Sequence, residues 1–419
     1  MVKFLDQAKG FAGNARGNVA VLFALSAIPV FAAVGAGVDF SRYVAIETQL
    51  NAALDAASLA AATAPAASSD VQRQDIAKKA FDANMAGGAA TDLSTTSSFT
   101  IKNGVVTGEA HADMATMLLN IVGLTNFDVV ARNEVALPSA KKAEVAFVLD
   151  YSGSMADPAG GQIKYQAMGQ AATKLIHTLS TQAPGKVKYA LVPFSQAVYV
   201  TLPSGYVKGA SGTSWTGCTQ DRQYPYNLTD TAPDVGNDAS KWGQPMVAHP
   251  WKSSCSDYAN QHLVVRPLTT DYAGLKAQIA SMTPYQNTHI ALGAEFGYQI
   301  LSPNGAFTGA TAYGDKTTSK FMVILTDGMQ TEPAFGPGGS RTVAQGDSNL
   351  ESICANAKAS GITIVTLAYD LYDTSQRKRL QNCASDPNAD FFVVNSGKDV
   401  AAAFEAITAA INQTVYLSK

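Results

Sequence analysis

An uncharged apolar run constrains the fold of this chain more than any other feature of its sequence. It reads VAVLFALSAIPVFAAVGAGV and extends from Val19 to Val38. About 20 apolar residues are enough for a helix to cross the roughly 30 Å of hydrocarbon in a bilayer. Lys3, Lys9 and Arg16 precede the run against the single acid Asp6, and positively charged flanks stay on the cytoplasmic side. The sequence therefore predicts one membrane-spanning helix, with a cytoplasmic N-terminus and the rest of the chain outside.

A cleaved signal peptide is the alternative interpretation of the same run. The small residues from Ala33 to Ala36 offer a cleavage site. The run, however, exceeds the apolar region of about 7–15 residues that is typical of signal peptides. The anchor is therefore the preferred interpretation.

The four cysteines support export under either interpretation, because an even number outside the cytoplasm favours disulfides over free thiols. Cys354 and Cys383 flank one predicted strand, and Cys218 and Cys255 lie in one loop-rich segment, so these two pairings are favoured. Other pairings stay open at this stage. Closing a loop of this size contributes about 3–4 kcal/mol by the chain-entropy estimate.

Composition excludes some classes of protein. The 419 residues are 47% hydrophobic and 15% charged, which is typical of a folded chain. A net charge of -3 gives no electrostatic footprint for nucleic acid. The length predicts two or three folded units.

The order of segments is predicted from changes in pattern along the chain. A helix is expected from about Asp70 to Gly87, and a hairpin is expected around the turn-forming pair Asn103-Gly104. The predicted segments are a cytoplasmic N-terminus (1–18), a transmembrane helix (19–40), an Ala-rich stalk helix (41–64), a small α+β segment (65–140) and a main domain (141–419) with a loop-rich insertion at about 200–266.

Buried strands alternate with helices in the main domain, which predicts an α/β fold with a doubly wound, mostly parallel sheet. The predicted strands are 145–149, 187–194, 321–326, 362–368 and 391–394. The predicted helices are 164–179, 272–282, 289–301, 350–360 and 399–415. The insertion holds Trp215, Trp242 and Trp251, which form either a partner surface or a small core of its own.

Oxygen-bearing side chains follow two of the predicted strands. The strand in VAFVLDYSGSM ends in Asp150, Ser152 and Ser154, and the strand FMVILT ends in Asp327. Ligands of doubly wound sheets collect at the carboxyl ends of the strands. Carboxylate and hydroxyl oxygens suit Mg²⁺, Mn²⁺ or Ca²⁺, with Mg²⁺ preferred here.

The Asp-x-Ser-x-Ser pattern resembles the metal-ion-dependent adhesion site of the von Willebrand factor A family. That resemblance implies that Ser152 and Ser154 bind the metal directly, and that Asp150 and Asp327 bind it directly or through water. The family's third loop supplies a threonine at a helix start, and Thr288 fits that place as an N-cap-type residue. Gln286 stands where many relatives have glycine. Such a site leaves one coordination position for an acidic side chain of a protein partner.

Two other interpretations of these residues compete with the metal site. Asp and Ser at a strand-to-helix turn often only cap the helix. A hydrolase is disfavoured, because the serines lack the G-x-S-x-G elbow and the histidines form no H-E-x-x-H pattern. The sequence therefore predicts a binding protein with no catalytic residues and no organic cofactor.

The N-terminal sequence GNVAVLFALSAIPVFAAVGAGVDFSR, followed by LNAALDAASLAA, resembles TadE/TadG-like proteins of Flp pilus assembly. This resemblance implies a single-pass protein of the bacterial inner membrane whose main domain is periplasmic or surface-facing and binds pilus or envelope components. Leu22 stands where processed Tad pilins carry a glutamate, so an uncleaved anchor is expected. The alternative is a structural scaffold or pilus-associated subunit in which metal only stabilises the fold.

Overall fold

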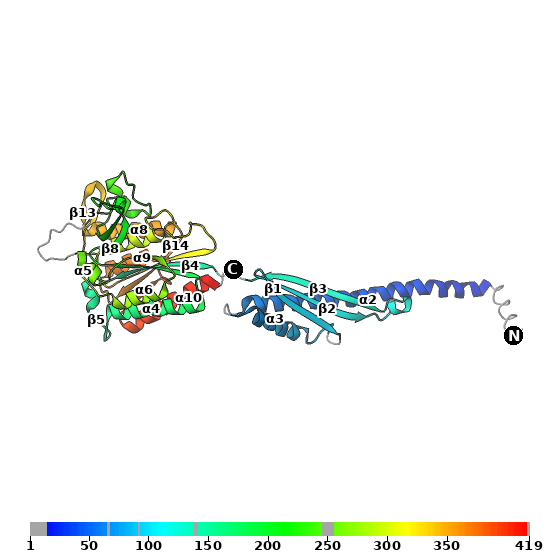
Figure 1. Cartoon of the computed structure of the whole chain (residues 1–419). Coiled ribbons are helices and arrows are strands. Elements are labelled where there is room, and N and C mark those ends of the chain that lie inside the picture. Colours follow the sequence, from blue (N-terminus) through cyan, green and yellow to red (C-terminus); the bar gives the residue numbers. More distant parts are fainter. Residues whose placement is uncertain (1–14, 65–67, 91–92, 138–140, 245–254, 417–419) are drawn as a thin grey trace. The chain divides into compact units, whose positions relative to one another are not determined.

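The computed structural model describes residues 15–64, 68–90, 93–137, 141–244 and 255–416 (Figure 1). The chain divides into two compact units, Met1–Pro138 and Ser139–Lys419. The predicted cytoplasmic residues 1–14, the linker residues 138–140 and Trp251 lie outside the described residues.

Helix α2 (Ala15–Thr63) is continuous from the predicted membrane span into the predicted stalk. Among the described residues it is the one helix long and apolar enough to cross a membrane. Its side chains are mostly exposed up to Val38, whereas Ile46, Leu50 and Leu54 are fully buried. The predicted span and stalk thus form one helix, and the apolar stripe of the stalk forms the core of the first unit.

A helix and a small sheet cover this part of α2. Helix α3 (Asp70–Met85) begins with a capping box in which Ser69 and Gln72 satisfy each other's backbone N–H groups. The antiparallel sheet has the order β1-β2-β3, with strands β1 (Thr95–Lys102), β2 (Val105–Ala115) and β3 (Asn126–Ala136). The predicted hairpin is confirmed, and its turn residues Asn103 and Gly104 both have positive φ. A short 3₁₀ turn, η1 (Leu119–Val122), lies between β2 and β3.

The second unit is built on a six-stranded mixed sheet of order β10-β7-β4-β11-β14-β15. Its parallel strands are β4 (Lys142–Asp150), β7 (Val187–Phe194), β11 (Thr318–Thr326), β14 (Ile362–Tyr369) and β15 (Phe391–Val394). The edge strand β10 (Arg266–Thr269) is antiparallel and was not predicted. The chain is thus an α/β protein, as expected, and its sheet is mixed.

Two apolar layers cover the two faces of this sheet. Along β4, Phe147 and Leu149 enter one core, and Ala146 and Val148 enter the other, because successive side chains of a strand point to opposite faces. The first core is closed by α4 (Lys164–Gln182), α6 (Tyr272–Ser281) and α10 (Gly397–Tyr416). The second is closed by α7 (Ile290–Leu301) and α8 (Val343–Ala359), and α9 (Thr374–Cys383) packs beside β14.

Short elements fill the connections of the second unit. The strands among them form three two-stranded pairs: β5 (Pro158–Ala159) with β6 (Gln162–Ile163), β8 (Val198–Pro203) with β9 (Ser214–Thr219), and β12 (Ala334–Phe335) with β13 (Arg341–Thr342). The helical ones are α5 (Cys255–Asn260) and the 3₁₀ turns η2 (Gly153–Ala156), η3 (Ser204–Tyr206), η4 (Tyr226–Leu228), η5 (Asp238–Ser240) and η6 (Pro337–Gly339).

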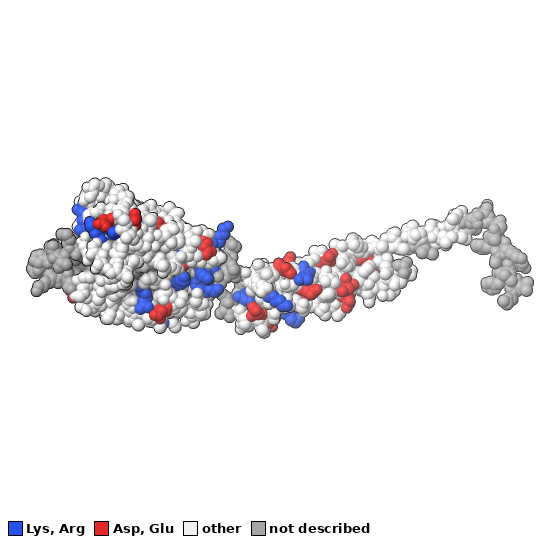
Figure 2. Space-filling view, turned by 45° about the horizontal axis from the view of Figure 1, so that its top comes forward, with Lys and Arg blue, Asp and Glu red and all other residues white. Residues whose placement is uncertain are grey.

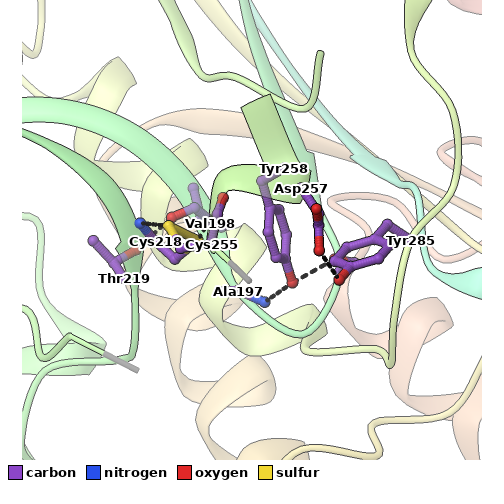
Figure 3. The surroundings of a disulfide bond; sticks show 9 residues. Ala197, Val198, Cys218, Thr219, Cys255, Asp257, Tyr258 and Tyr285 are labelled. Carbon is purple, nitrogen blue, oxygen red and sulfur yellow. Dashed lines mark hydrogen bonds between the residues drawn. A yellow bond between two sulfur atoms is a disulfide. The ribbon is translucent and has the colours of Figure 1, made fainter. Parts of the chain in front are cut away.

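Both favoured disulfides are confirmed. Cys218–Cys255 joins β9 to α5 within the insertion (Figure 3), and Cys354–Cys383 joins α8 to α9. The insertion is part of the main fold. Trp242 is fully buried and stacks on Phe296 of α7 at 4.9 Å between ring centroids. This tryptophan therefore belongs to the core of the sheet domain, which neither sequence interpretation anticipated.

Candidate metal centre

The first loop of the candidate site follows β4. Asp150 ends the strand and is fully buried. Its Oδ1 accepts a hydrogen bond of 2.7 Å from the Ser152 N–H, and its Oδ2 accepts one of 2.6 Å from the Thr326 hydroxyl. The carboxylate is therefore fixed by its own loop and by the neighbouring strand β11.

Asp327 is brought to the same edge because β4 and β11 are parallel neighbours, with Leu149 opposite Leu325. The Ser154 hydroxyl donates to Asp327 Oδ1 at 2.8 Å. The hydroxyl oxygens of Ser152 and Ser154 lie 3.2 Å apart. Two carboxylates and two hydroxyls thus meet at the carboxyl ends of these strands.

The third loop places Thr288 beside Gly328, the residue that follows Asp327. The Thr288 hydroxyl oxygen lies 3.3 Å from where a Cβ on Gly328 would stand. The expectation that Thr288 caps helix α7 is wrong, because the N-cap is His289, whose ring accepts from the Leu292 N–H. The Thr288 carbonyl instead accepts the Thr331 N–H, and the Thr288 N–H donates to the Thr331 hydroxyl.

The backbone of the third loop is tied to the first. The Gln286 carbonyl accepts the Gly153 N–H at 2.7 Å, and the Tyr151 carbonyl accepts the Tyr285 N–H at 2.7 Å. Gln286 has a φ of 68°, which is the conformation that glycine adopts without strain. Gln286 therefore carries backbone strain that a glycine at this position would avoid.

The same loop is also held from the insertion. The Tyr285 hydroxyl donates to Asp257 of α5 at 2.7 Å, and its ring meets Tyr258 edge-on at 5.3 Å (Figure 3). Helix α5 begins at Cys255 of the first disulfide. The insertion therefore fixes the loop that carries Thr288.

Lys164 is a member of the site that the sequence analysis missed. Its Nζ lies 2.7 Å from Asp327 Oδ2, and the two side chains are 7% and 0% exposed. Lys164 is the first residue of α4, where a positive charge is disfavoured by the helix dipole. The signal in the sequence was a lysine at the start of the predicted helix 164–179, because a lysine that is buried there requires an acidic partner.

Two buried carboxylates dominate the electrostatics of the site. Burial, reinforced by the negative charge of Asp327, raises the pKa of Asp150 to about 7, against hydrogen bonds from Thr326 and Ser152 that lower it. Among the described residues no three His, Cys, Asp or Glu side chains gather as a metal-ligand group. The remaining donors are hydroxyls, and the mixture of carboxylate and hydroxyl oxygens fits Mg²⁺.

One family model matches a segment near the N-terminus of the chain. Residues 17–64 match the Tad family, the TadE/G-like proteins of Flp pilus assembly. No curated protein sequence matches the chain.

Solved structures resemble the chain at low similarity. The von Willebrand factor domain of the type V pili tip protein Mfa5 from Porphyromonas gingivalis is 15% identical, with 67% of this chain and 98% of that chain covered and a TM-score of 0.41. The pilus adhesin SpaC from Lactobacillus rhamnosus GG is 13% identical, with 77% and 35% covered and a TM-score of 0.40, so this chain spans about a third of its length. The PilB minor pilin from Streptococcus sanguinis is 11% identical, with 78% and 79% covered and a TM-score of 0.38.

Proposed function

We propose that this chain is a membrane-anchored, extracytoplasmic component of Flp/Tad pilus assembly or adhesion that binds an acidic protein partner through a divalent cation. The observation that carries the metal-binding proposal is the meeting of Asp150, Ser152, Ser154, Thr288 and Asp327 at one sheet edge. The second unit is proposed to be a doubly wound, von Willebrand A-like domain.

The anchor is proposed from the first unit. Residues 17–64 carry the family match, and α2 is long and apolar enough to span a bilayer. Leu22 replaces the glutamate of processed pilins, which supports an uncleaved helix. The proposed location is the bacterial inner membrane, with the N-terminus cytoplasmic and the second unit periplasmic or surface-facing.

Each side chain of the site has a proposed role. Ser152 and Ser154 would hold the cation directly, and Asp150, Asp327 and Thr288 would hold it directly or through water. The bound cation would supply an open coordination position for a partner's carboxylate. The protein's own contribution is to keep these oxygens fixed in three loops that are hydrogen-bonded to one another. No catalytic role is proposed for any residue.

Calorimetric titration of the segment 139–419 with Mg²⁺ and Mn²⁺ tests this proposal. The Asp150→Ala, Ser152→Ala double variant is expected to lose about 100-fold or more in affinity, because it removes a carboxylate and a hydroxyl from the hard-cation donor set. The matched control is Asp315→Ala, Thr317→Ala, which breaks a similar carboxylate–hydroxyl pair just before β11, away from the site. Equal binding by the folded double variant and the parent would contradict the proposal.

Metal affinity is expected to rise with pH. The pKa of Asp150 is about 7 in the fold, above its ordinary value, so the protonated form predominates below pH 7 and a cation must displace that proton. Apparent affinity should increase about tenfold per pH unit below pH 7 and level off above it, as linkage to one proton requires. The same titration at several pH values measures this slope, and a flat profile would show that Asp150 is already ionised.

The scaffold alternative is favoured by one observation, the Lys164–Asp327 ion pair, which supplies a positive charge without a metal. On that alternative, a chelator lowers the thermal stability of the domain while pilus assembly survives in an Asp150→Ala variant. On the leading proposal, the folded Asp150→Ala variant fails to bind its partner.

A further inference from the structure

The loop between β2 and β3 exposes a cluster of apolar side chains. No charged residue occurs from Met114 to Phe127. Four apolar side chains of the loop are well exposed: Met117 (66%), Leu118 (40%), Ile121 (80%) and Leu124 (52%). A contiguous exposed apolar patch of this kind marks a surface that binds something.

The loop is fixed to α2 by one buried carboxylate. Asp39 is fully buried and accepts the N–H groups of Met117, Leu118 and Leu119 at 2.9, 3.0 and 2.9 Å. The Leu118 Cβ lies 2.7 Å from where a Cβ on Gly35 would stand, so the loop touches the helix backbone there. Gly35 precedes Asp39 by four residues, or about 6 Å along the axis. The loop therefore extends alongside the apolar span.

The apolar surface of the loop is continuous with that of the helix. Phe31 and Val34 are 72% and 58% exposed, and neither α2 nor the loop carries a charge at this level. In Figure 2 the part of α2 that leads toward the N-terminus is white, whereas charged side chains lie over the folded part of the same unit. An apolar groove runs between the two elements, lined by Ala36, Phe40, Tyr43, Leu119 and Phe127.

The loop also satisfies its own polar backbone, as a segment in lipid must. The Thr116 hydroxyl donates to the carbonyls of Leu124 and Thr125. Besides the three N–H groups bound by Asp39, those of Thr116, Ile121, Gly123 and Leu124 all donate to carbonyls within the loop. Its exposed surface is apolar apart from Asn120, and these hydrogen bonds stay within the loop and with Asp39.

We propose that the loop 116–124 inserts into the bilayer leaflet beside α2, with lipid as its partner. This inference rests on the proposed membrane anchor. If Val38 marks the end of the hydrocarbon span, Gly35 lies about 4.5 Å inside it, and Leu118 lies against Gly35. Lipid is the occupant that matches both the continuity with the spanning helix and the closed hydrogen bonds. The loop then sets the depth and tilt of the helix, with Asp39 as the connecting group.

A fluorescence experiment on the full chain in lipid nanodiscs tests this inference. All four cysteines are paired in disulfides, so a single introduced cysteine can be labelled with an environment-sensitive dye. The positions are Ile121 in the loop, Phe31 in the span, and Asn103 in the turn at the opposite end of β2. All three are exposed, so the label should not disturb the fold. Lipids with a spin label near the headgroup serve as quenchers.

Quenching at Ile121→Cys is expected to be about fivefold stronger than at Asn103→Cys, because interfacial apolar segments sit roughly 5–10 Å below the headgroup boundary. A water-exposed dye at Ile121, with Phe31→Cys quenched by lipid, would overturn the loop inference and leave the anchor intact. A dye at Ile121 that is shielded from water but not quenched would assign the loop to a protein contact and also overturn it. A water-exposed dye at Phe31 would overturn the anchor and the loop inference together.

Discussion

Replacing Lys164 with methionine is expected to tighten Mg²⁺ binding by the segment 139–419. The Lys164 ammonium lies 2.7 Å from Asp327 Oδ2 in a buried pair. The ammonium and a bound cation would therefore compete for the same carboxylate. At an effective dielectric constant of about 20, two unit charges roughly 5 Å apart repel by about 3 kcal/mol, and a divalent ion feels twice that. If the methionine relieves only half of the repulsion between two unit charges, the affinity for Mg²⁺ rises about tenfold.

Lys320→Met is the matched control. Lys320 Nζ forms a pair of 2.6 Å with Glu144, and the two side chains are 5% and 2% exposed. The pair joins the starts of β4 and β11, at the end of the sheet away from Asp150 and Asp327. Both variants should lose stability, because each removes an ammonium group from a buried carboxylate. Glu144 keeps hydrogen bonds from Thr311, as Asp327 keeps the one from Ser154. Only Lys164→Met should bind metal more tightly.

The opposite outcome has a definite meaning. If Lys164→Met binds Mg²⁺ more weakly than the parent, the lysine orients Asp327 for the metal and does not compete with it. If neither protein binds metal, the Lys164–Asp327 pair is the permanent charge balance of the site, and the metal-binding proposal and its scaffold alternative both fail. Calorimetry on the parent and both variants under identical conditions separates these cases.

The sheet could be predicted from the sequence because its strands are apolar runs with clear ends. Each predicted parallel strand is present: β7 and β15 have the predicted bounds, and β4, β11 and β14 have ends shifted by one to three residues. The missed elements carry weak local signals. Strand β10 has four residues with none fully buried. Helix α9 is polar over TSQRKRLQNC and buries only Gln376, Leu380 and Cys383. Tertiary packing, which no local pattern reports, stabilises both elements.

The candidate ligands could be predicted because their spacing along the chain is regular and their strands are neighbours. The structure brings together Asp150, Ser152, Ser154, Thr288 and Asp327. Lys164 was missed because its role depends on where α4 begins relative to Asp327, 163 residues away. The buried face of the stalk helix could not be predicted, because Ala-rich sequence gives no sign of which face a distant sheet will cover.

A second ion pair, between Arg222 and Glu295, was also beyond sequence reasoning. Arg222 comes from the insertion and Glu295 from α7, and their side chains are 0% and 1% exposed. The Arg222 Nε lies 2.6 Å from Glu295 Oε1, and its other nitrogens donate to the carbonyls of Thr231 and Thr229. The guanidinium also lies 4.9 Å from the centre of the Trp242 ring. One arginine therefore joins the insertion to the core of the domain.

Arg222→Met is expected to destabilise the second unit by about 3–5 kcal/mol, because it leaves the buried Glu295 carboxylate without its charged partner. The carbonyls of Thr229 and Thr231 keep the Gln299 side-chain amide as a donor. Burial raises the pKa of Glu295 to about 7, with Arg222 opposing the shift. A carboxyl with a raised pKa favours folding when protonated, so stability from this group falls as pH rises through 7. The loss of unfolding free energy in Arg222→Met should therefore be larger at about pH 8 than at about pH 6.

Urea unfolding with both disulfides intact measures this effect. Arg266→Met is the control, because its pair with Asp271 is partly exposed, with side chains 32% and 55% accessible. Exposed pairs contribute about 0–1 kcal/mol. Combining Arg222→Met with Glu295→Leu should recover much of the lost stability, since no unpaired charge then stays buried. If the double variant is as unstable as Arg222→Met alone, the arginine acts through Thr229, Thr231 and Trp242, and the ion pair is secondary.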